Sequence, residues 1–411
     1  MNSIANNGKR FVQENLIGVY LLAFMIPFQP KWYSLSIMIL LLEQFIREYE
    51  IDKTLILKKL NFKNAGIWLV LFFLMHFVGL IHTENTSFAW MDIGMKASFI
   101  LFPLYFLIFS VKINWKYLIH AFLTGLFLSI IVNFSLSFVE FFNSNSISHF
   151  FEAELTHLMH RSYWATYLSI GYIFLWYRML YKNRKRFLNF LGVFTLFVLT
   201  LMTGAKIGLI LLLIITLIMI TLWFKLSTKK LNIIIAISGL LVVLFLVNLN
   251  FPQLYQRSKL SVKTLFIPME KRDLTSFEST TARILMWDTA TDLIEENFWY
   301  GVGTGDVKDE LQKRNYEKGF TGVAEKNYNS HNQFLNTHVA IGFFSALFLF
   351  LAFLTPFLFT KGNNRFVQIL VVLVLFLSLL PEAFLETQAG IIPVAFFLSL
   401  IGLNSINHVK A

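Results

Sequence analysis

Residues 187–223 read FLNFLGVFTLFVLTLMTGAKIGLILLLIITLIMITLW, and Lys206 is the only charged residue among them. One membrane-spanning helix takes about 20 residues, so this stretch is too long for one span and is expected to form two. The turn between them is predicted at Thr203-Gly204, because glycine favours tight turns. Such a stretch is typical of a membrane protein.

The rest of the chain repeats this pattern. Of the 411 residues, 56% are hydrophobic and only 14% are charged, whereas a soluble domain carries roughly a quarter of its residues as charges. Apolar runs lie at about 14–28, 33–46, 65–81, 94–110, 117–139, 162–180, 187–204, 206–224, 231–249, 333–359, 366–381 and 389–404. They predict an all-α polytopic membrane protein with about twelve transmembrane helices.

The distribution of lysine and arginine predicts the orientation, because both are enriched in cytoplasmic loops. With the N-terminus inside, twenty basic residues fall on the inner side and four on the opposite short loops and span ends. The twenty are Lys9, Arg10, Arg47, Lys53, Lys58, Lys59, Lys63, Lys112, Lys116, Arg178, Lys182, Arg184, Lys185, Arg186, Lys225, Lys229, Lys230, Lys361, Arg365 and Lys410; the four are Lys31, Lys96, Arg161 and Lys206. We expect both termini in the cytoplasm. The net charge of +11 records this orientation and requires no nucleic-acid partner.

Residues 250–332 form a polar segment on the expected periplasmic side, with 11 basic and 12 acidic residues. Helices are predicted at 282–296, with a cap at Ser279-Thr280, and at 307–318, with a glycine-rich turn between them. The predicted organisation is therefore helices in 1–249, a large periplasmic loop in 250–332 and helices in 333–411. The chain has no cysteine, which excludes disulfides and cysteine-ligated metals.

Ionisable residues at the outer edge of the spans are candidates for function, because charge is costly in a membrane. They are Lys96, Glu140, Arg161, Lys206, Glu382 and Glu386. For Lys96 and Glu140 we expect side chains that reach out to the interface. For His76 and His120, which lie inside spans, we expect a packed and hydrogen-bonded role. Lys206 either reaches to the interface in the same way or binds an anionic lipid headgroup.

Two elements of the polar segment carry further candidates. Arg283 and Trp287 share a helix face at i, i+4; Arg283 is either an ordinary surface residue or a phosphate ligand. His331, Asn332 and His338 lie where the segment re-enters the membrane, and the two histidines are seven residues apart, roughly on one helical face. That spacing is a weak metal pattern, whereas a neutral imidazole at a membrane mouth suits a general base.

The sequence Gly301-Val302-Gly303-Thr304-Gly305 has the glycine spacing of a phosphate-binding loop. It follows no predicted strand and lacks the Gly-Lys-Ser/Thr ending of a P-loop. We interpret it as a turn.

Taken together, these patterns resemble the O-antigen ligase and polymerase superfamily of bacterial membrane glycosyltransferases. Residues 204–208 (GAKIG) correspond to the family's short Ser-Arg-Gly-type pattern, and Arg283 and Trp287 to its Arg-x-x-x-Trp helix start. Residues 297–303 (NFWYGVG) correspond to Asn-Pro-x-x-Gly-x-Gly, and residues 331–335 (HNQFL) to His-Asn-x-x-Leu. The departures are Lys206 in place of arginine, which loses the bidentate fork, and Phe298 in place of proline.

This resemblance implies a GT-C-like fold in the bacterial inner membrane and an active site on the periplasmic face. It implies transfer of a glycan from undecaprenyl pyrophosphate to a lipid A-core or glycan acceptor, without metal, nucleotide sugar or other cofactor. His331 would act as the base, and Arg283 and Lys206 would stabilise the leaving pyrophosphate. Arg161, Asn332, His338 and Trp287 would help to bind the substrates.

Several functions remain open on the sequence alone. An O-antigen ligase is the leading interpretation, a repeat-unit polymerase of the same superfamily is the close alternative, and a protein-glycosylating oligosaccharyltransferase is the third. A transporter or lipid flippase would show inverted repeats and charged or broken helices near the bilayer midplane. We find neither pattern in the sequence.

Overall fold

The computed structural model describes residues 16–46, 60–109, 113–181, 186–226 and 252–407, and within these ranges it is all-helical, with 78% helix and no strands. The long helices are α2 (Ile17–Met25), α3 (Tyr33–Ile46), α5 (Ala65–Leu80), α6 (Thr86–Lys96), α7 (Ser98–Ile108), α8 (Trp115–Ser144), α9 (Arg161–Tyr181), α10 (Arg186–Met202), α11 (Lys206–Leu226), α13 (Pro252–Leu265), α14 (Ser279–Glu296), α15 (Val307–Glu317), α17 (Gln333–Phe359), α18 (Arg365–Ser378) and α19 (Gln388–Asn407). Short helical turns are η1 (Pro30–Trp32), η2 (Ile147–Phe150), η3 (Met269–Lys271), α16 (Thr321–Glu325) and η4 (Phe384–Glu386). The predicted run at 231–249 and many of the predicted inner basic residues lie outside the described residues.

Every other predicted apolar run coincides with a helix. Among the described residues, 4 helical segments are long and apolar enough to cross a membrane: Thr86–Ile108, Trp115–Ser144, Lys206–Leu226 and Gln333–Phe359. The apolar helices Ala65–Leu80, Phe187–Met202, Arg365–Ser378 and Gln388–Gly402 are shorter.

Helix α11 is apolar on both its faces. It buries Leu211 and Ile215 against the bundle, while Leu213 and Leu217 on the opposite face remain exposed. Exposed rows of leucine are unfavourable in water and favourable in lipid, so this helix supports a membrane setting. The turn before α11 lies at Thr203-Gly204 as predicted, and Gly204 adopts a left-handed backbone with φ 57°.

The core of the bundle is formed around α9 and α19. Helix α9 is buried on nearly all sides, which a helix of a large core requires. Its hydroxyl groups find internal partners: Tyr167 donates to the carbonyl oxygen of Ala389 in α19, and Thr166 pairs with Ser378 in α18. The N-terminal end of α9 is thereby held against the segment that joins α18 to α19.

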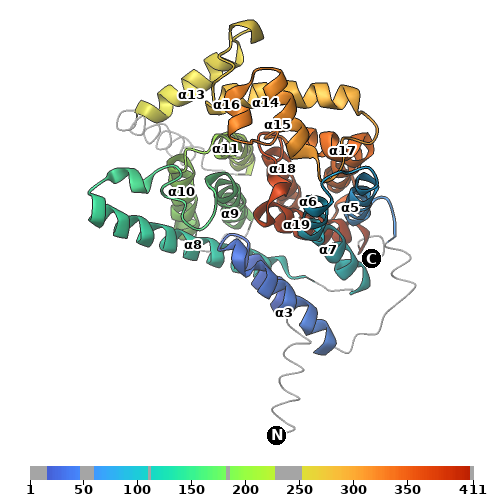
Figure 1. Cartoon of the computed structure of the whole chain (residues 1–411). Helices are drawn as coiled ribbons and strands as arrows, with labels where there is room; N and C mark the ends of the chain where they lie inside the picture. Colours follow the sequence, from blue (N-terminus) through green and yellow to red (C-terminus); the bar gives the residue numbers. More distant parts are fainter. Residues whose placement is uncertain (1–15, 47–59, 110–112, 182–185, 227–251, 408–411) are drawn as a thin grey trace.

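The polar segment folds into its own group of helices at one end of the bundle, where residues 252–325 are coloured yellow and orange in Figure 1. Helix α15 matches the prediction, but α14 begins earlier than predicted, and its cap is Glu278. The Glu278 carboxylate accepts hydrogen bonds from the backbone N–H groups of Thr280 and Thr281, at 2.9 and 3.0 Å. The predicted cap at Ser279-Thr280 is therefore wrong, because both hydroxyl groups accept hydrogen bonds from Lys206 instead.

Helix α17 is broken at Ile341 and Gly342, and the glycine-rich turn docks into the break. The backbone N–H groups of Val302 and Gly303 donate to the carbonyl oxygens of Val339 and Ala340, at 2.8 and 2.9 Å. The turn thus satisfies carbonyl groups that the broken helix leaves without intrahelical partners. Because these N–H groups are occupied, the turn is a structural element, as the sequence predicts, and does not cradle phosphate.

Replacing Gly342 with alanine is expected to destabilise the protein by about 3 kcal/mol or more, because a positive φ and a backbone clash act together. Gly342 has φ 76°, and a Cβ atom there would lie 2.1 Å from the carbonyl oxygen of Trp299. The measurement is thermal unfolding of the purified protein in detergent. Gly94→Ala is the matched control, since a Cβ at Gly94 meets nothing within 4 Å. Equal stability of the two variants would contradict the docking of the turn.

Candidate functional site

Glu382 is the centre of the cluster that brings the sequence candidates together. It lies in residues 379–387, which join α18 to α19 and are called here the α18–α19 connection. Its Oε1 accepts hydrogen bonds from Arg283 Nη2 and Ser162 Oγ, both at 3.1 Å, and its Oε2 accepts one from His331 Nδ1 at 2.9 Å. Three distant parts of the chain therefore meet at one carboxylate.

His331 is held by the backbone just before α17, not by the helix. Its φ of 43° places it in a left-handed conformation, and its N–H donates to Asn329 Oδ1 at 3.0 Å. Asn332 caps α17 by accepting from the N–H groups of Phe334 and Leu335, at 2.9 and 3.1 Å. With Nδ1 committed to Glu382, the remaining ring nitrogen, Nε2, has no hydrogen-bond partner among the described residues.

Arg283 is fixed by the loop helix and the α18–α19 connection. Its Nε donates to the carbonyl oxygen of Pro381 at 3.0 Å, and Nη1 donates to the carbonyl oxygen and hydroxyl of Ser279, at 3.0 and 2.6 Å. Together with the Glu382 bond, these contacts occupy four of the five N–H groups of a guanidinium. Arg283 therefore orients Glu382 and has about one N–H group left for a ligand.

Lys206 reaches from the start of α11 to the N-terminus of α14. Its Nζ donates to Thr280 Oγ1 at 2.6 Å and to Ser279 Oγ at 3.1 Å, and it lies 3.8 Å from Glu278 Oε1. Burial opposes ionisation of Glu278, but the bonds from the Thr281 and Thr280 amides and the charge of Lys206 outweigh burial and lower its pKa below the usual carboxyl value. Ser279 contacts both cations, so Lys206 and Arg283 belong to one cluster.

Arg161 follows His160, which lies close to this cluster. Arg161 Nη1 is 3.4 Å from Glu152 Oε2, and a Cβ at Gly204 would contact the Glu152 side chain at 3.1 Å. The loop that precedes α9 therefore covers the turn between α10 and α11. His160 is close enough to Glu382 to interact electrostatically with it, but burial outweighs that attraction and lowers the pKa of His160.

The charge of Glu382 is stabilised by its partners. Burial alone would raise the pKa of this carboxyl, but the hydrogen bond and charge of His331, and the charges of Arg283 and His160, lower it overall. Glu382 is therefore a fixed anion next to an imidazole. A carboxylate in this position holds the ring orientation and tautomer and stabilises an imidazolium.

Two predicted site residues lie outside the cluster. His338 Nε2 hydrogen-bonds to the carbonyl oxygen of Phe298 at 3.0 Å, and α17 begins at Gln333, so His331 and His338 do not share a helical face. That prediction is wrong because Asn332 starts the helix one residue after His331. Trp287 lies on α14 one turn after Arg283, and its buried Nε1 has no hydrogen-bond acceptor in the described part of the chain.

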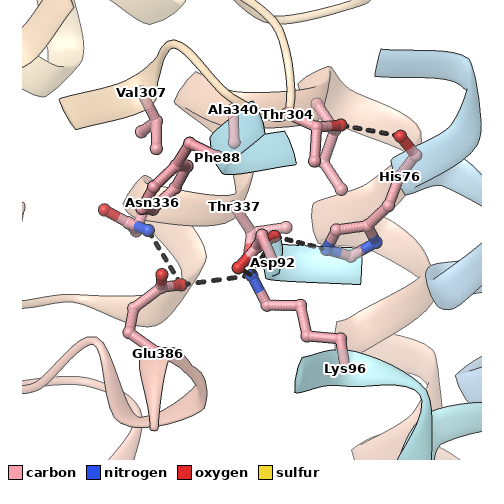
Figure 2. Close-up of a pocket in the computed structure, with 11 residues that line it drawn as sticks. His76, Phe88, Asp92, Lys96, Thr304, Val307, Asn336, Thr337, Ala340 and Glu386 are labelled. Carbon is pink, nitrogen blue, oxygen red and sulfur yellow. Dashed lines mark hydrogen bonds and ion pairs between the residues drawn. The ribbon is translucent and has the colours of Figure 1, made fainter. Parts of the chain in front are cut away.

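A second group of charges is buried near the α18–α19 connection (Figure 2). Lys96 Nζ lies 2.7 Å from both carboxylate oxygens of Asp92 and 3.5 Å from Glu386 Oε1. These residues line a pocket together with His76, Thr304 and Asn336, and its free volume of about 10 Å³ is room for about one water molecule. Lys96 is only 5% exposed, so the predicted reach to the interface is wrong: the buried carboxylate of Asp92 and the partly buried carboxylate of Glu386 hold it inside. His76 is packed as predicted, with Nδ1 bonded to the carbonyl oxygen of Phe72.

Within the described ranges, no three histidine, aspartate or glutamate side chains converge in a way that would hold a metal ion. The cluster instead offers a polarised imidazole, a fixed carboxylate and three nearby cations. Such a set can remove a proton from a hydroxyl group and stabilise an anionic leaving group.

Comparison with protein families gives a match. Residues 191–351, less than half of the chain, match the family model described as O-antigen ligase. The matched segment contains Lys206, Arg283 and His331, whereas Arg161 and Glu382 lie outside it. A search of curated proteins finds no match.

Proposed function

We propose that the chain is a membrane glycosyltransferase of the O-antigen ligase and polymerase superfamily that uses a lipid-linked glycan, and the match of residues 191–351 to the family model described as O-antigen ligase supports this. The specific activity proposed is that of an O-antigen ligase. It transfers a polysaccharide from undecaprenyl pyrophosphate to lipid A-core on the periplasmic face of the bacterial inner membrane. The observation that carries the proposal is the hydrogen-bonded set Arg283–Glu382–His331.

In the proposed reaction, His331 Nε2 takes the proton of the acceptor hydroxyl group. The acceptor oxygen forms a bond to the anomeric carbon of the donor sugar, and the bond from that carbon to the phosphate oxygen breaks. The electron pair leaves with undecaprenyl pyrophosphate. Glu382 holds His331 through Nδ1 and stabilises the imidazolium that forms, as the carboxylate of a catalytic triad does. Asn332 supports this geometry by fixing the start of α17 next to His331.

The leaving pyrophosphate requires cations more than a proton donor, since it already carries negative charge. The side chains of Lys206, Arg161 and Arg283 are 38%, 25% and 17% exposed. We assign most of the phosphate binding to Lys206 and Arg161. Arg283 contributes one hydrogen bond to the phosphate, through the N–H group that its internal bonds leave. Trp287 and His338 lie on elements that border the cluster and contribute to substrate binding in this proposal.

The proposal includes the membrane arrangement that the sequence predicts. About twelve spans occupy residues 1–249 and 333–411, both termini are cytoplasmic, and residues 250–332 form the periplasmic loop. The apolar outer face of α11 supports contact with membrane lipids, and the reaction uses neither a metal nor another cofactor. The transporter alternative lacks support in the cluster, which is built around one imidazole–carboxylate pair.

Lys206→Ala is expected to lower the transfer rate about 10- to 100-fold, which corresponds to the loss of one charge-assisted contact to the leaving group. The Michaelis constant for the lipid-linked donor should rise in parallel, because the contact is made to the donor. Lys206→Arg keeps the charge and should retain most of the activity. Lys225→Ala at the other end of α11 is the control. An unchanged rate in Lys206→Ala would remove Lys206 from the phosphate site.

A gene deletion in the host separates the ligase from the polymerase of the same superfamily. Accumulation of long glycan on the lipid carrier, with unmodified lipid A-core, is the result expected for a ligase. Lipopolysaccharide capped with single repeat units would instead identify a polymerase. Unchanged lipopolysaccharide and carrier-linked glycan would contradict both functions.

A further inference from the structure

The buried ion cluster of Asp92, Lys96 and Glu386 takes no part in the proposed chemistry, yet it is built at high cost. Asp92 and Lys96 are 3% and 5% exposed, and they lie within the candidate span Thr86–Ile108. Buried ions are stable only when each is well paired, and ionisable residues inside a membrane usually serve a function. The cluster therefore calls for a specific role.

The contacts of Glu386 indicate what the cluster holds. Besides Lys96, its Oε1 accepts hydrogen bonds from Asn336 Nδ2 at 3.1 Å and Gln333 Nε2 at 3.4 Å (Figure 2 shows the first). Gln333 also accepts from the N–H group of Leu385 at 2.6 Å, and its own N–H group donates to the carbonyl oxygen of Leu379 at 2.8 Å. Both ends of the α18–α19 connection are thus fixed to the first turn of α17.

The same short connection carries Glu382. Glu386 lies four residues after Glu382 and is the last residue of the turn η4, which is buried through Phe384 and Leu385. The ion pair between Lys96 of α6 and Glu386 is therefore linked to Glu382 by one short, packed segment. No other described side chain supplies a positive charge to Glu386 at ion-pair distance.

From this arrangement we infer that Lys96 is a positioning residue: through Glu386 it fixes the α18–α19 connection, so that Glu382 is held between Arg283 and His331. The expected effect on catalysis rests on the proposed function. The expected effect on the structure of the connection does not. Losing the contact from Lys96 releases the connection, and Glu382 then spends less time in the geometry that orients His331.

The structural consequence can be measured directly because the chain contains no cysteine. A cysteine introduced at Ala383, which is 5% exposed, reports the opening of the connection by its rate of reaction with a maleimide. Ala290→Cys, in the fully buried part of α14, is the control reporter for unfolding elsewhere. In Lys96→Met the reporter at 383 should react about tenfold faster or more than in the unchanged background, through local opening. The reporter at 290 should remain protected.

Lys96→Met leaves the buried carboxylate of Asp92 and the partly buried carboxylate of Glu386 without their cation, and such a variant can fail to fold. The double variant Asp92→Asn/Lys96→Met removes one of these charges and leaves Glu386 with its two amide donors. The same faster reaction at 383 alone is expected. Unchanged protection at 383 in a folded variant would overturn the inference. Exposure of both reporters in both variants would also overturn it, because the cluster would then stabilise the whole fold.

The activity of the same variants tests the catalytic consequence. A positioning role predicts a fall in kcat of about tenfold or more with little change in KM for the lipid-linked donor, since Lys96 does not touch the phosphate site. A rise in KM at constant kcat would contradict it. If the unchanged protein transfers no glycan, the proposed function fails, while the labelling comparison still decides whether Lys96 holds the connection.

Discussion

Replacing His331 with alanine is expected to lower the rate of glycan transfer by about 10²- to 10⁴-fold, the range that a positioned general base contributes. The structure gives the reason: Nδ1 is bonded to Glu382 at 2.9 Å, so Nε2 is the ring nitrogen available to an acceptor hydroxyl group. The measurement is the initial rate of product formation by the purified variant, with donor and acceptor both saturating. The side chain is partly exposed, and thermal unfolding measured on the same preparation shows whether the variant is folded.

His120→Ala is the matched control for this variant. His120 is exposed near the start of α8, so its predicted packing in the core is wrong, although its ring does hydrogen-bond to the carbonyl oxygen of Lys116. We expect its transfer rate to equal that of the unchanged protein. A His331→Ala protein that transfers glycan as fast as the control would remove His331 from the role of base.

Glu382→Gln is expected to lower kcat by about 10²-fold or more, because an amide cannot stabilise the imidazolium and can present the wrong atom to His331. The amide also removes the charge that pairs with Arg283, which lies 3.1 Å away. Initial rates and folded content are measured together on the same preparation. Glu325→Gln, at an exposed position of α16, is the control, and equal kcat in the two variants would contradict the central role of Glu382.

The lowered pKa of Glu382 adds a pH dependence to this prediction. A carboxyl group whose pKa is lower in the folded protein stabilises the fold above its unfolded pKa of about 4.3, and this contribution is lost as the pH falls through the lowered value. The unfolding temperature of the unchanged protein should therefore fall more than that of Glu382→Gln between neutral and acidic pH. Parallel curves for the two proteins would show that the carboxylate is not stabilised by its partners.

The sequence predicts much of the helical fold because long apolar runs leave few alternatives. The turn at Gly204, helix α15 and the docked glycine-rich turn follow from local residue preferences and agree with the structure. The cap of α14 does not agree with the structure: local rules predict Ser279 as the capping residue, but Glu278 caps the helix. The Ser279 hydroxyl group instead accepts hydrogen bonds from Arg283, one helical turn further on, and from Lys206, whose position depends on tertiary packing.

In the candidate site, too, the sequence predicts individual residues but not the contacts between distant parts of the chain. Lys206, Arg283 and His331 stand out in the sequence by residue type and place, and the structure brings Arg283 and His331 to one carboxylate. Glu382 is visible in the sequence only as one of several acidic residues at the ends of spans. Its role as their common partner depends on α14, α17 and the α18–α19 connection meeting in space. The sequence does not reveal the full environment of Lys96 for the same reason, because one of its two partners, Glu386, is 290 residues away.

The most direct test of the account is transfer by the purified, unchanged protein in a membrane mimetic. The assay supplies undecaprenyl pyrophosphate carrying a glycan, together with lipid A-core, and contains no nucleotide sugar. We expect glycosylated lipid A-core and the release of one undecaprenyl pyrophosphate for each glycan transferred. Recovery of both substrates unchanged, in a preparation shown to be folded, would contradict it.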